Sequence, residues 1–295
     1  MSLTNEQKLW FTEYETVAKE VYQNSTNVYS DLVEHSTING EEKISFIEGT
    51  QEFAASGSDF DKHTYNVLDR EKRKITASGG QLANWWSHME LARALYNPIP
   101  AALRSQGHAL SRWNSATIRD AITGNAISQY EGTETMTSKA LPASQVIGNG
   151  TAAITTDDFQ AIKSILVRNY ALQSGETVNC AIPQENVDIL QKDSELMSTD
   201  FNGGAAPLID GHTFGMIRGV NVVLDIDVNW SSTIYSCPFW VKSAVEFATQ
   251  QSPIIRQGEL QERNFIPQAY MKVDNGASRM RDYGAGNLQT LKAYT

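Results

Sequence analysis

The chain has little of what metal centres and disulfide frameworks are built from. It holds 2 cysteines, Cys180 and Cys237, and 5 scattered histidines in 295 residues. Two cysteines are too few for a disulfide framework, and dispersed histidines give no metal-ligand spacing. We therefore expect no bound metal and no cofactor.

Long apolar runs are also missing. No stretch approaches the roughly 18–20 apolar residues of a membrane-spanning helix, so no membrane partner is expected. The first residues, MSLTNEQKLWF, lack the basic and then apolar layout of a secretory signal, and nothing indicates secretion. With 41% hydrophobic and 20% charged residues, the composition is that of a globular protein with one large domain or two modest ones.

Familiar catalytic motifs are absent as well. There is no G-x-S-x-G elbow and no H-E-x-x-H zinc motif. Cys180 stands in an apolar stretch with no basic neighbour to activate its thiol, so a core position is expected. Two histidines lie near acids, but such pairs are more often structural than catalytic: His88 with Glu90, and His212 with Asp210. The chain is not expected to be an enzyme.

One segment, "DGHTFGMIRGVNVVLDIDV" at 210–228, resembles a phosphate loop at first sight. Its glycines, Gly211, Gly215 and Gly219, precede a strand, with no lysine and no helix N-terminus to hold phosphate. They predict a turn. The alternation after them predicts a half-buried strand, with Asp225 and Asp227 on its wetter face. A metal-dependent enzyme that uses these two aspartates stays open as an alternative.

Charge is acidic and uneven. The net charge is −10, and residues 183–228 contribute −6 of it. Neutralising phosphates requires lysine and arginine, so the chain is a poor candidate for wrapping nucleic acid with its whole surface.

The first 78 residues suggest association. Residues 5–35 begin with apolar residues at helical spacing, which predict a helix packed on its own core or an arm that docks on a neighbour. Residues 41–78 predict a long, charged β-hairpin with a Gly/Ser tip, and such a ribbon needs a partner surface. The candidate contact residues between copies are Trp10, Tyr14, Ala55, Ser56, Gly57, Ser58, Arg70, Arg73 and Lys74.

The middle of the chain predicts helices at 81–100 and 101–130, followed by a loop at 131–153. In the second helix Arg104, Arg112 and Arg119 fall on one stripe. This stripe is either a solvated face or a basic face turned to a neighbour or to a polyanion in the interior.

Beyond residue 154 helical and extended patterns mix. A Thr155–Asp158 capping box predicts a helix that ends near Gly175. "TVNCAIP" predicts a buried strand, Pro183 starts a helix, and "CPFWVKSAVEFATQQSP" predicts a strand and then a helix. The C-terminal 40 residues alternate as strands do. This order of elements predicts an α+β fold.

The order of these motifs resembles the major capsid proteins of tailed bacteriophages with the Hong Kong 97-like fold. The resemblance rests on "NCAIPQENVDILQKDSELMSTDF", "PLIDGHTFGMIRGVNVVLDIDV", "WVKSAVEFATQQSPIIRQG" and "YMKVDNGASRMRDYGAGNLQTLKAY", and upstream on "REKRKITASGGQLANWW" and the helix after it. It covers nearly the whole chain.

The resemblance implies a shell subunit and a division of the chain. The parts would be an N-terminal arm (1–38), an extended loop that reaches over a neighbour (39–79), a peripheral domain with a long spine helix (80–150), an axial domain (151–245) and the return strands of the peripheral domain (246–295). The glycines would then form the turn into an axial-domain strand.

The same resemblance implies the partners. The subunit would self-assemble into hexamers and pentamers of an icosahedral head in the virion, built in the host cytoplasm around double-stranded DNA that it contacts non-specifically. Because the arm is short, a separate scaffolding protein is expected, together with a portal; decoration proteins are left open. Encapsulin-type nanocompartment shells share the fold and are the nearest alternative.

Overall fold

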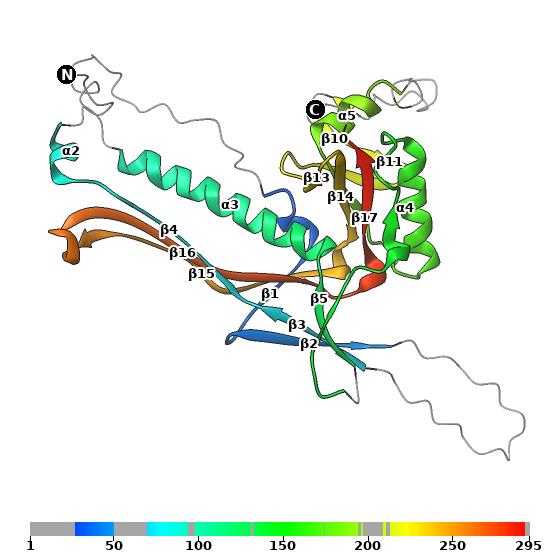
Figure 1. Cartoon of the computed structure of the whole chain (residues 1–295), viewed down its shortest axis with the longest axis horizontal. Coiled ribbons are helices and arrows are strands. Elements are labelled where there is room, and N and C mark those ends of the chain that lie inside the picture. The colour runs from blue at the N-terminus through cyan, green and yellow to red at the C-terminus, as the bar shows by residue number, and fades with distance from the viewer. Residues whose placement is uncertain are drawn as a thin grey trace, which may run out of the picture.

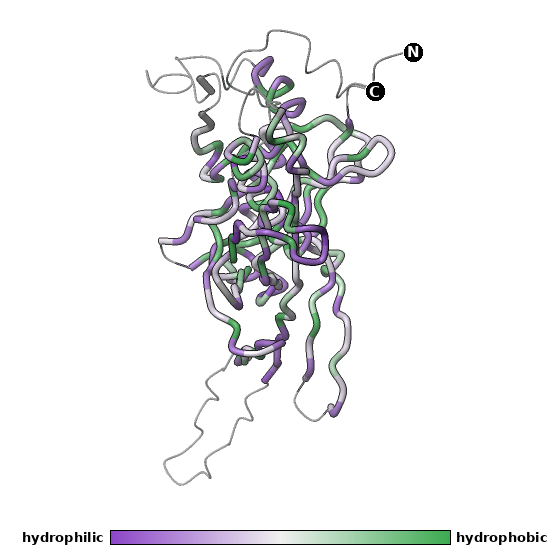
Figure 2. The backbone as a smooth tube through the Cα atoms, turned by 90° about the vertical axis from the view of Figure 1, so that its left-hand side faces the viewer, coloured by the Kyte–Doolittle hydropathy of each residue, from purple (hydrophilic) through white to green (hydrophobic). Residues whose placement is uncertain are grey.

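The computed structural model describes residues 27–49, 70–93, 98–130, 133–173, 175–193, 196, 209–210 and 213–292. Over these residues the chain builds one mixed sheet, one long twisted sheet, one small sheet and one two-stranded pair. A long helix lies along the long sheet and reaches the mixed sheet at one end (Figure 1). None of the described helices combines the length and apolar character needed to span a bilayer. Seen from the side, the body is narrow, and hydrophobic and hydrophilic positions alternate along the tube (Figure 2).

The mixed sheet holds most of the core. Its strand order is β11-β12-β8-β14-β17-β7, and β13 pairs with β14. The strands are β7 (Val146–Ile147), β8 (Val178–Ile182), β11 (Met216–Ile217), β12 (Val220–Leu224), β13 (Trp230–Ser231), β14 (Ile234–Val241) and β17 (Ala285–Leu291). All five residues of β8 are buried, which explains why four of them are apolar, because a strand covered on both faces has no solvated side. The fifth, Asn179, accepts a hydrogen bond from the Asn221 amide at 2.8 Å.

Two helices belong to this sheet, and both begin where the sequence predicts. α4 (Thr156–Arg168) opens with the capping box, in which the Thr155 N–H donates to Asp158 Oδ2 at 2.8 Å. α5 (Gln184–Leu190) follows Pro183. However, α4 ends at Arg168, earlier than the predicted end near Gly175. The glycine turn is confirmed at Gly219, which has φ +84° between β11 and β12.

The long sheet has the order β1-β15-β16-β4, with β1 (Glu34–Thr37), β4 (Ser78–Trp85), β15 (Val245–Leu260) and β16 (Ile266–Arg279). α3 (Ile99–Thr123) packs along β16. Gln106 is fully buried there, and its amide donates to the carbonyl of Ala269 at 3.1 Å. The remaining described strand pair is β9 (Ile209–Asp210) with β10 (Thr213–Phe214).

Two predicted helices are wrong over much of their length. "QLANW" belongs to β4, because each residue from Ser78 to Trp85 pairs with β16. Among the described residues of the segment predicted as a helix at 81–100, α2 (His88–Arg93) is helical before Pro98. After a 3-10 turn at Lys242–Ala244, "VEFATQQSP" forms the start of β15, which is paired with β1 on one side and β16 on the other. In both segments strand pairing overrides local helical spacing.

The helix predicted over 101–130 ends at Thr123, and the loop predicted at 131–153 contains short strands. The small sheet has the order β2-β3-β5-β6, with β2 (Glu42–Glu48), β3 (Arg70–Thr76), β5 (Ala126–Tyr130) and β6 (Thr137–Lys139). The predicted hairpin is confirmed in its described part, where β2 and β3 pair from Glu42↔Thr76 to Glu48↔Arg70. Its predicted tip, residues 55–58, lies outside the described residues.

Candidate assembly interface

The β2–β3 pair turns apolar side chains toward solvent. Along β2 the exposed positions alternate, and among them Ile44 and Phe46 keep 45% and 65% of their surface. The Lys72 ammonium lies 5.8 Å from the centre of the Phe46 ring. The outward face of an antiparallel sheet is ordinarily polar. Exposed apolar residues on this projecting pair are typical of a surface that another protein covers.

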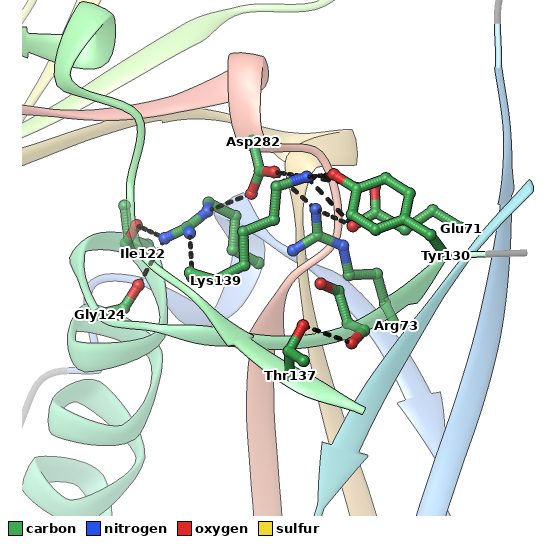
Figure 3. A network of polar contacts seen from close by, with 10 residues as sticks. Glu71, Arg73, Ile122, Gly124, Tyr130, Thr137, Lys139 and Asp282 are labelled. Carbon is green, nitrogen blue, oxygen red and sulfur yellow. Dashed lines mark hydrogen bonds and ion pairs between the residues drawn. The ribbon is translucent and has the colours of Figure 1, made fainter. Parts of the chain in front are cut away.

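A buried ionic network holds the base of the hairpin against the body (Figure 3). Arg73 of β3 is 1% exposed, and its Nη2 donates to Asp282 Oδ2 at 2.6 Å. The same nitrogen lies 2.9 Å from Glu71 Oε1. Lys139 of β6 bridges both acids, at 2.8 Å from Asp282 and 3.2 Å from Glu71. Two strands, β3 and β6, and the turn after β16 are thereby joined.

Arg279 extends this network to the end of α3. Its Nε donates to Asp282 Oδ1 at 2.9 Å, and its Nη1 donates to the carbonyls of Ile122 and Gly124 at 3.2 and 2.6 Å. These carbonyls lie at the C-terminal end of the helix, where no intrahelical donor reaches them. One set of charged side chains therefore holds both the base of the hairpin and the C-terminal end of α3.

The network shifts the pKa values of its members. Burial alone would raise the pKa of Asp282, but hydrogen bonds from Arg73, Lys139 and Arg279 hold it below its usual value. Burial alone would lower the pKa of Lys139, but its hydrogen bonds to Asp282 and Tyr130 raise it. Both groups are therefore charged at neutral pH. Arg73 consequently serves inside its own chain, which corrects its prediction as a contact between copies.

A second ion pair anchors the other strand of the hairpin. Lys43 of β2 pairs with Glu246 of β15, and the Ser45 hydroxyl donates to the same carboxylate at 3.5 Å. Lys43 and Ser45 lie on the inward face of β2, opposite Ile44 and Phe46. The inward face of β2 is thus fixed to the body of the subunit, while its outward face is exposed to solvent.

The aspartates of the opening segment occupy a different environment from the one predicted. β12 ends at Leu224, and Asp225 is 3% exposed, so its predicted place on the wetter face is wrong. Its Oδ2 accepts hydrogen bonds from Tyr29 Oη at 2.5 Å and Arg119 Nη1 at 2.9 Å. Asp227 is exposed, and its N–H donates to Asp225 Oδ1. An aspartate already neutralised by an arginine is a poor ligand for a cation.

The buried aspartate also corrects the arginine stripe. Arg119 is 8% exposed and pairs with Asp225 of its own chain, so it faces neither a neighbour nor the interior of a shell. Arg104 is exposed and Arg112 is half-buried. Within the described residues, no group of three or more His, Cys, Asp or Glu side chains could hold a metal ion.

The other predicted contact residues are placed in part. Arg70 is exposed as the first residue of β3, with its Nε 4.0 Å from Glu48 Oε1, and Lys74 pairs with Glu42 across the hairpin. The remaining candidates, Trp10, Tyr14, Ala55, Ser56, Gly57 and Ser58, lie outside the described residues.

Sequence reasoning missed a set of exposed aromatic residues around a cavity at the hairpin base. The cavity has a volume of about 570 Å³, and Phe46, Tyr170 and Tyr283 stand at its edge with 65%, 93% and 55% of their surfaces exposed. The alternation "EKISFIE" could have indicated Phe46, because it places this ring on the same face as Glu42 and Glu48. No local signal marks Tyr170 or Tyr283.

The two cysteines are not reactive groups. Cys180 and Cys237 are fully buried and free. Burial raises the pKa of the Cys237 thiol to about 12 and that of Cys180 well above its ordinary value. Both thiols are therefore neutral near pH 7, as expected of core residues.

Solved structures with the same fold come from phage heads. The chain resembles the capsid protein of cyanophage Pam1, with a TM-score of 0.76 and 12% identity over 100% of this chain and 99% of the other. It resembles that of cyanophage P-SCSP1u, with a TM-score of 0.72 and 16% identity over 98% and 95%. For Mycobacterium phage Che8 the TM-score is 0.70, with 16% identity over 94% and 96%. The predicted α+β phage capsid fold is confirmed.

Sequence comparison gives the family. No curated protein sequence matches the chain. The family model described as phage capsid protein matches residues 8–291, which is nearly the whole chain. The predicted role as a major capsid protein of the virion is thereby confirmed, and neither the encapsulin nor the metal-enzyme alternative is favoured. The chain belongs to the phage capsid protein family, whose members are structural proteins that assemble into a shell.

Proposed function

We propose that this chain forms the hexamers and pentamers of an icosahedral head that encloses double-stranded DNA, and that it catalyses no reaction. The observation that carries the proposal is the projecting β2–β3 pair, which is fixed at its base by the Arg73–Asp282–Lys139 network and is apolar on its outward face. A β2–β3 pair that is held rigidly at its base and exposes an apolar face is suited to contact another copy of the chain.

The parts of the chain take the roles that the family suggests. Residues 1–38 act as an arm, 39–79 as the loop that reaches over a neighbour, 80–150 and 246–295 as the peripheral domain, and 151–245 as the axial domain. Arg70 and Lys74, together with Trp10, Tyr14 and residues 55–58, contact neighbouring copies. Arg104 and Arg112 face a neighbour or the packaged DNA.

The partners follow from this role. A separate scaffolding protein and a portal direct assembly in the host cytoplasm, and DNA is bound without sequence preference. The acidic net charge of −10 supports weak, non-specific contact with DNA, because it opposes tight binding of phosphates over an extended surface. Whatever decoration proteins bind would do so on the outside of the shell.

Shortening the loop tests the proposal. A variant that lacks residues 55–58 should fold normally, because the described core contains none of them, yet it should fail to form shells. A matched variant that keeps all four residues and carries only Ala55→Ser, so that the tip reads Ser-Ser-Gly-Ser, should still assemble. Circular dichroism reports folding, and negative-stain microscopy reports assembly. Normal shells from the shortened chain would contradict the role of the loop.

A further inference from the structure

The outer side of α4 forms a basic and apolar surface on an acidic chain. We call it the α4 flank and define it as Lys163, Val167, Arg168, Tyr170 and Arg218. All five residues are exposed, and Val167 and Tyr170 keep 52% and 93% of their surface. Four of them, all but Tyr170, line a shallow cavity of about 700 Å³. Arg218 lies 3.4 Å from the exposed carboxylate of Asp157 in α4, so the three cations and this one acid leave a local charge of +2. On a chain of net charge −10 such a surface is suited to an acidic counterpart.

Tyr170 occupies a position that favours glycine. It follows the last turn of α4 with φ +53°, and the two hydrogen bonds of a Schellman motif close the helix there: Tyr170 N–H to the Val167 carbonyl at 3.0 Å, and Ala171 N–H to the Leu166 carbonyl at 2.9 Å. A bulky residue in the left-handed region is disfavoured. Its ring is almost fully exposed and gains nothing within the monomer. Such an outlier suggests a role outside the chain.

A second exposed surface has the opposite charge. We call it the β12–β13 flank and define it as Ile226, Asp227, Trp230 and Asp120. Ile226 and Trp230 keep 68% and 60% of their surface, and both aspartates are exposed. Asn229 joins the two parts, since its amide donates to Asp120 Oδ1 at 2.9 Å. Lys292 covers one side of the Trp230 ring, 3.8 Å from its centre.

The two flanks lie on opposite sides of the mixed sheet. In Figure 1 the strands β14 and β17 stand between α4 and β13. One flank combines cations with Val167 and Tyr170, and the other combines carboxylates with Ile226 and Trp230. From this charge and apolar complementarity we infer that the α4 flank of one copy binds the β12–β13 flank of the next copy. Two different patches on opposite sides of one subunit make a head-to-tail contact, which is the kind that closes a ring.

A second copy fits these flanks better than other partners do. A polyanion would bind the cations of the α4 flank, but it would leave Ile226 and Trp230 unexplained. A small molecule in the shallow cavity would not cover Tyr170, which is not among the residues that line this cavity and keeps 93% of its surface exposed. Exposed tyrosine and tryptophan with surrounding charges are the composition of protein–protein contact sites. The inference rests on the proposed function and names the surfaces through which neighbouring copies meet.

Charge reversal on each flank, separately and together, tests the pairing. One variant carries Lys163→Glu and Arg168→Glu, a second carries Asp120→Lys and Asp227→Lys, and a third carries all four changes. Light scattering gives the protein concentration at half-assembly, and thermal unfolding checks the fold. Each two-site variant should need about a tenfold or higher concentration, because like charges then face each other. The four-site variant should return to within about threefold of the wild-type chain.

Tyr170 provides a second, independent readout. Tyr170→Gly should unfold at the same or a higher temperature, because glycine suits the left-handed position, while assembly should weaken by about tenfold. Tyr170→Phe keeps the ring and should assemble as the wild-type chain does. A role in the monomer alone would give the reverse pattern, with a lower melting temperature and unchanged assembly, and would overturn the inference.

The remaining outcomes separate the inference from the proposed function. Two-site variants that assemble like the wild type overturn the inference and leave the shell role standing. The same holds if only the α4-flank variant changes, by losing salt-dependent binding to a DNA duplex, while assembly is unaffected. A four-site variant that is as defective as its parents also overturns the pairing. A wild-type chain that never assembles, even with its scaffolding protein, overturns both.

Discussion

The Tyr29 hydroxyl donates a hydrogen bond to Asp225 Oδ2 at 2.5 Å, across 196 residues of sequence. Arg119 binds the same oxygen, so one buried carboxylate joins the segment before β1, the end of β12 and the last turns of α3. Nearby, the Tyr29 ring lies 5.2 Å from the Trp240 ring, and the Trp240 indole donates to the Leu32 carbonyl at 2.8 Å. These contacts fix the N-terminal segment on the mixed sheet.

Removing either partner of Asp225 should destabilise the subunit by different amounts. Tyr29→Phe deletes one hydrogen bond to a charged group and should lower the free energy of unfolding by about 1.5–3 kcal/mol. Arg119→Met leaves the buried carboxylate without a counter-charge and should cost about 3–5 kcal/mol. Urea unfolding followed by tryptophan fluorescence measures both. An Arg119→Met chain as stable as the wild type would show that the ion pair does not matter to the fold.

The hairpin base should tolerate mild acid. The pKa of Asp282 lies below its usual value because three cations bind it in the folded chain. Its contribution is therefore complete above the unfolded pKa of about 3.9 and is lost only as the pH falls through the lower, folded pKa. Thermal unfolding should show no loss from this group between pH 7 and pH 5.

An Asp282→Asn variant provides the comparison. It removes the counter-charge of Arg73 and Lys139 and should cost about 3–5 kcal/mol at neutral pH. Its penalty relative to the wild type should shrink only at the most acidic pH values, where wild-type Asp282 is itself protonated. A penalty that already shrinks between pH 7 and pH 5 would mean that the pKa of Asp282 is raised instead.

How far the sequence predicts this structure depends on whether the signal is local. The capping box of α4, the mostly apolar sequence of β8 and Pro183 before α5 are local signals, and all three elements begin where they are predicted, although α4 ends before its predicted end. β4 and the start of β15 were predicted as helices, because their strand character depends on pairing with β16, which comes later in the chain. No window of a few residues contains that pairing.

The difference between local signals and long-range contacts also explains which parts of the candidate interface could be predicted from the sequence. The hairpin and its need for a partner follow from charge and alternation. The burial of Asp225, Arg119 and Arg73 does not, because their partners lie 106 to 209 residues away in the sequence. Local alternation placed Asp225 on the wet face, whereas Tyr29 and Arg119 satisfy its charge inside the core. Long-range ion pairs reverse the burial that a strand pattern predicts.

A pair of glycine substitutions should separate packing from chain flexibility. A Cβ at Gly286 would lie 2.1 Å from Phe239 Cζ and 2.5 Å from the Gln145 carbonyl oxygen, so Gly286→Ala should destabilise the subunit by about 1–3 kcal/mol or more. Gly258→Ala is the matched control, since nothing lies within 4 Å of its Cβ position. Thermal unfolding should show equal stability for the control and the wild type; equal stability for Gly286→Ala would contradict the close packing of β14 on β17.

The thiols should report global unfolding. Because Cys180 and Cys237 are fully buried with raised pKa values, iodoacetamide at pH 8 should label neither in the native chain and both in urea. Mass spectrometry counts the labels. Rapid native labelling of either cysteine would show that the mixed sheet opens locally.

Self-assembly is the central property of a shell subunit. Sedimentation velocity of the purified chain over a range of concentrations, with negative-stain microscopy of the same samples, tests it most directly. We expect rings of five or six copies, tubes or closed shells, formed by the chain alone or after addition of its scaffolding protein. A chain that remains a folded monomer at every concentration, with scaffolding protein present, would contradict the assembly role.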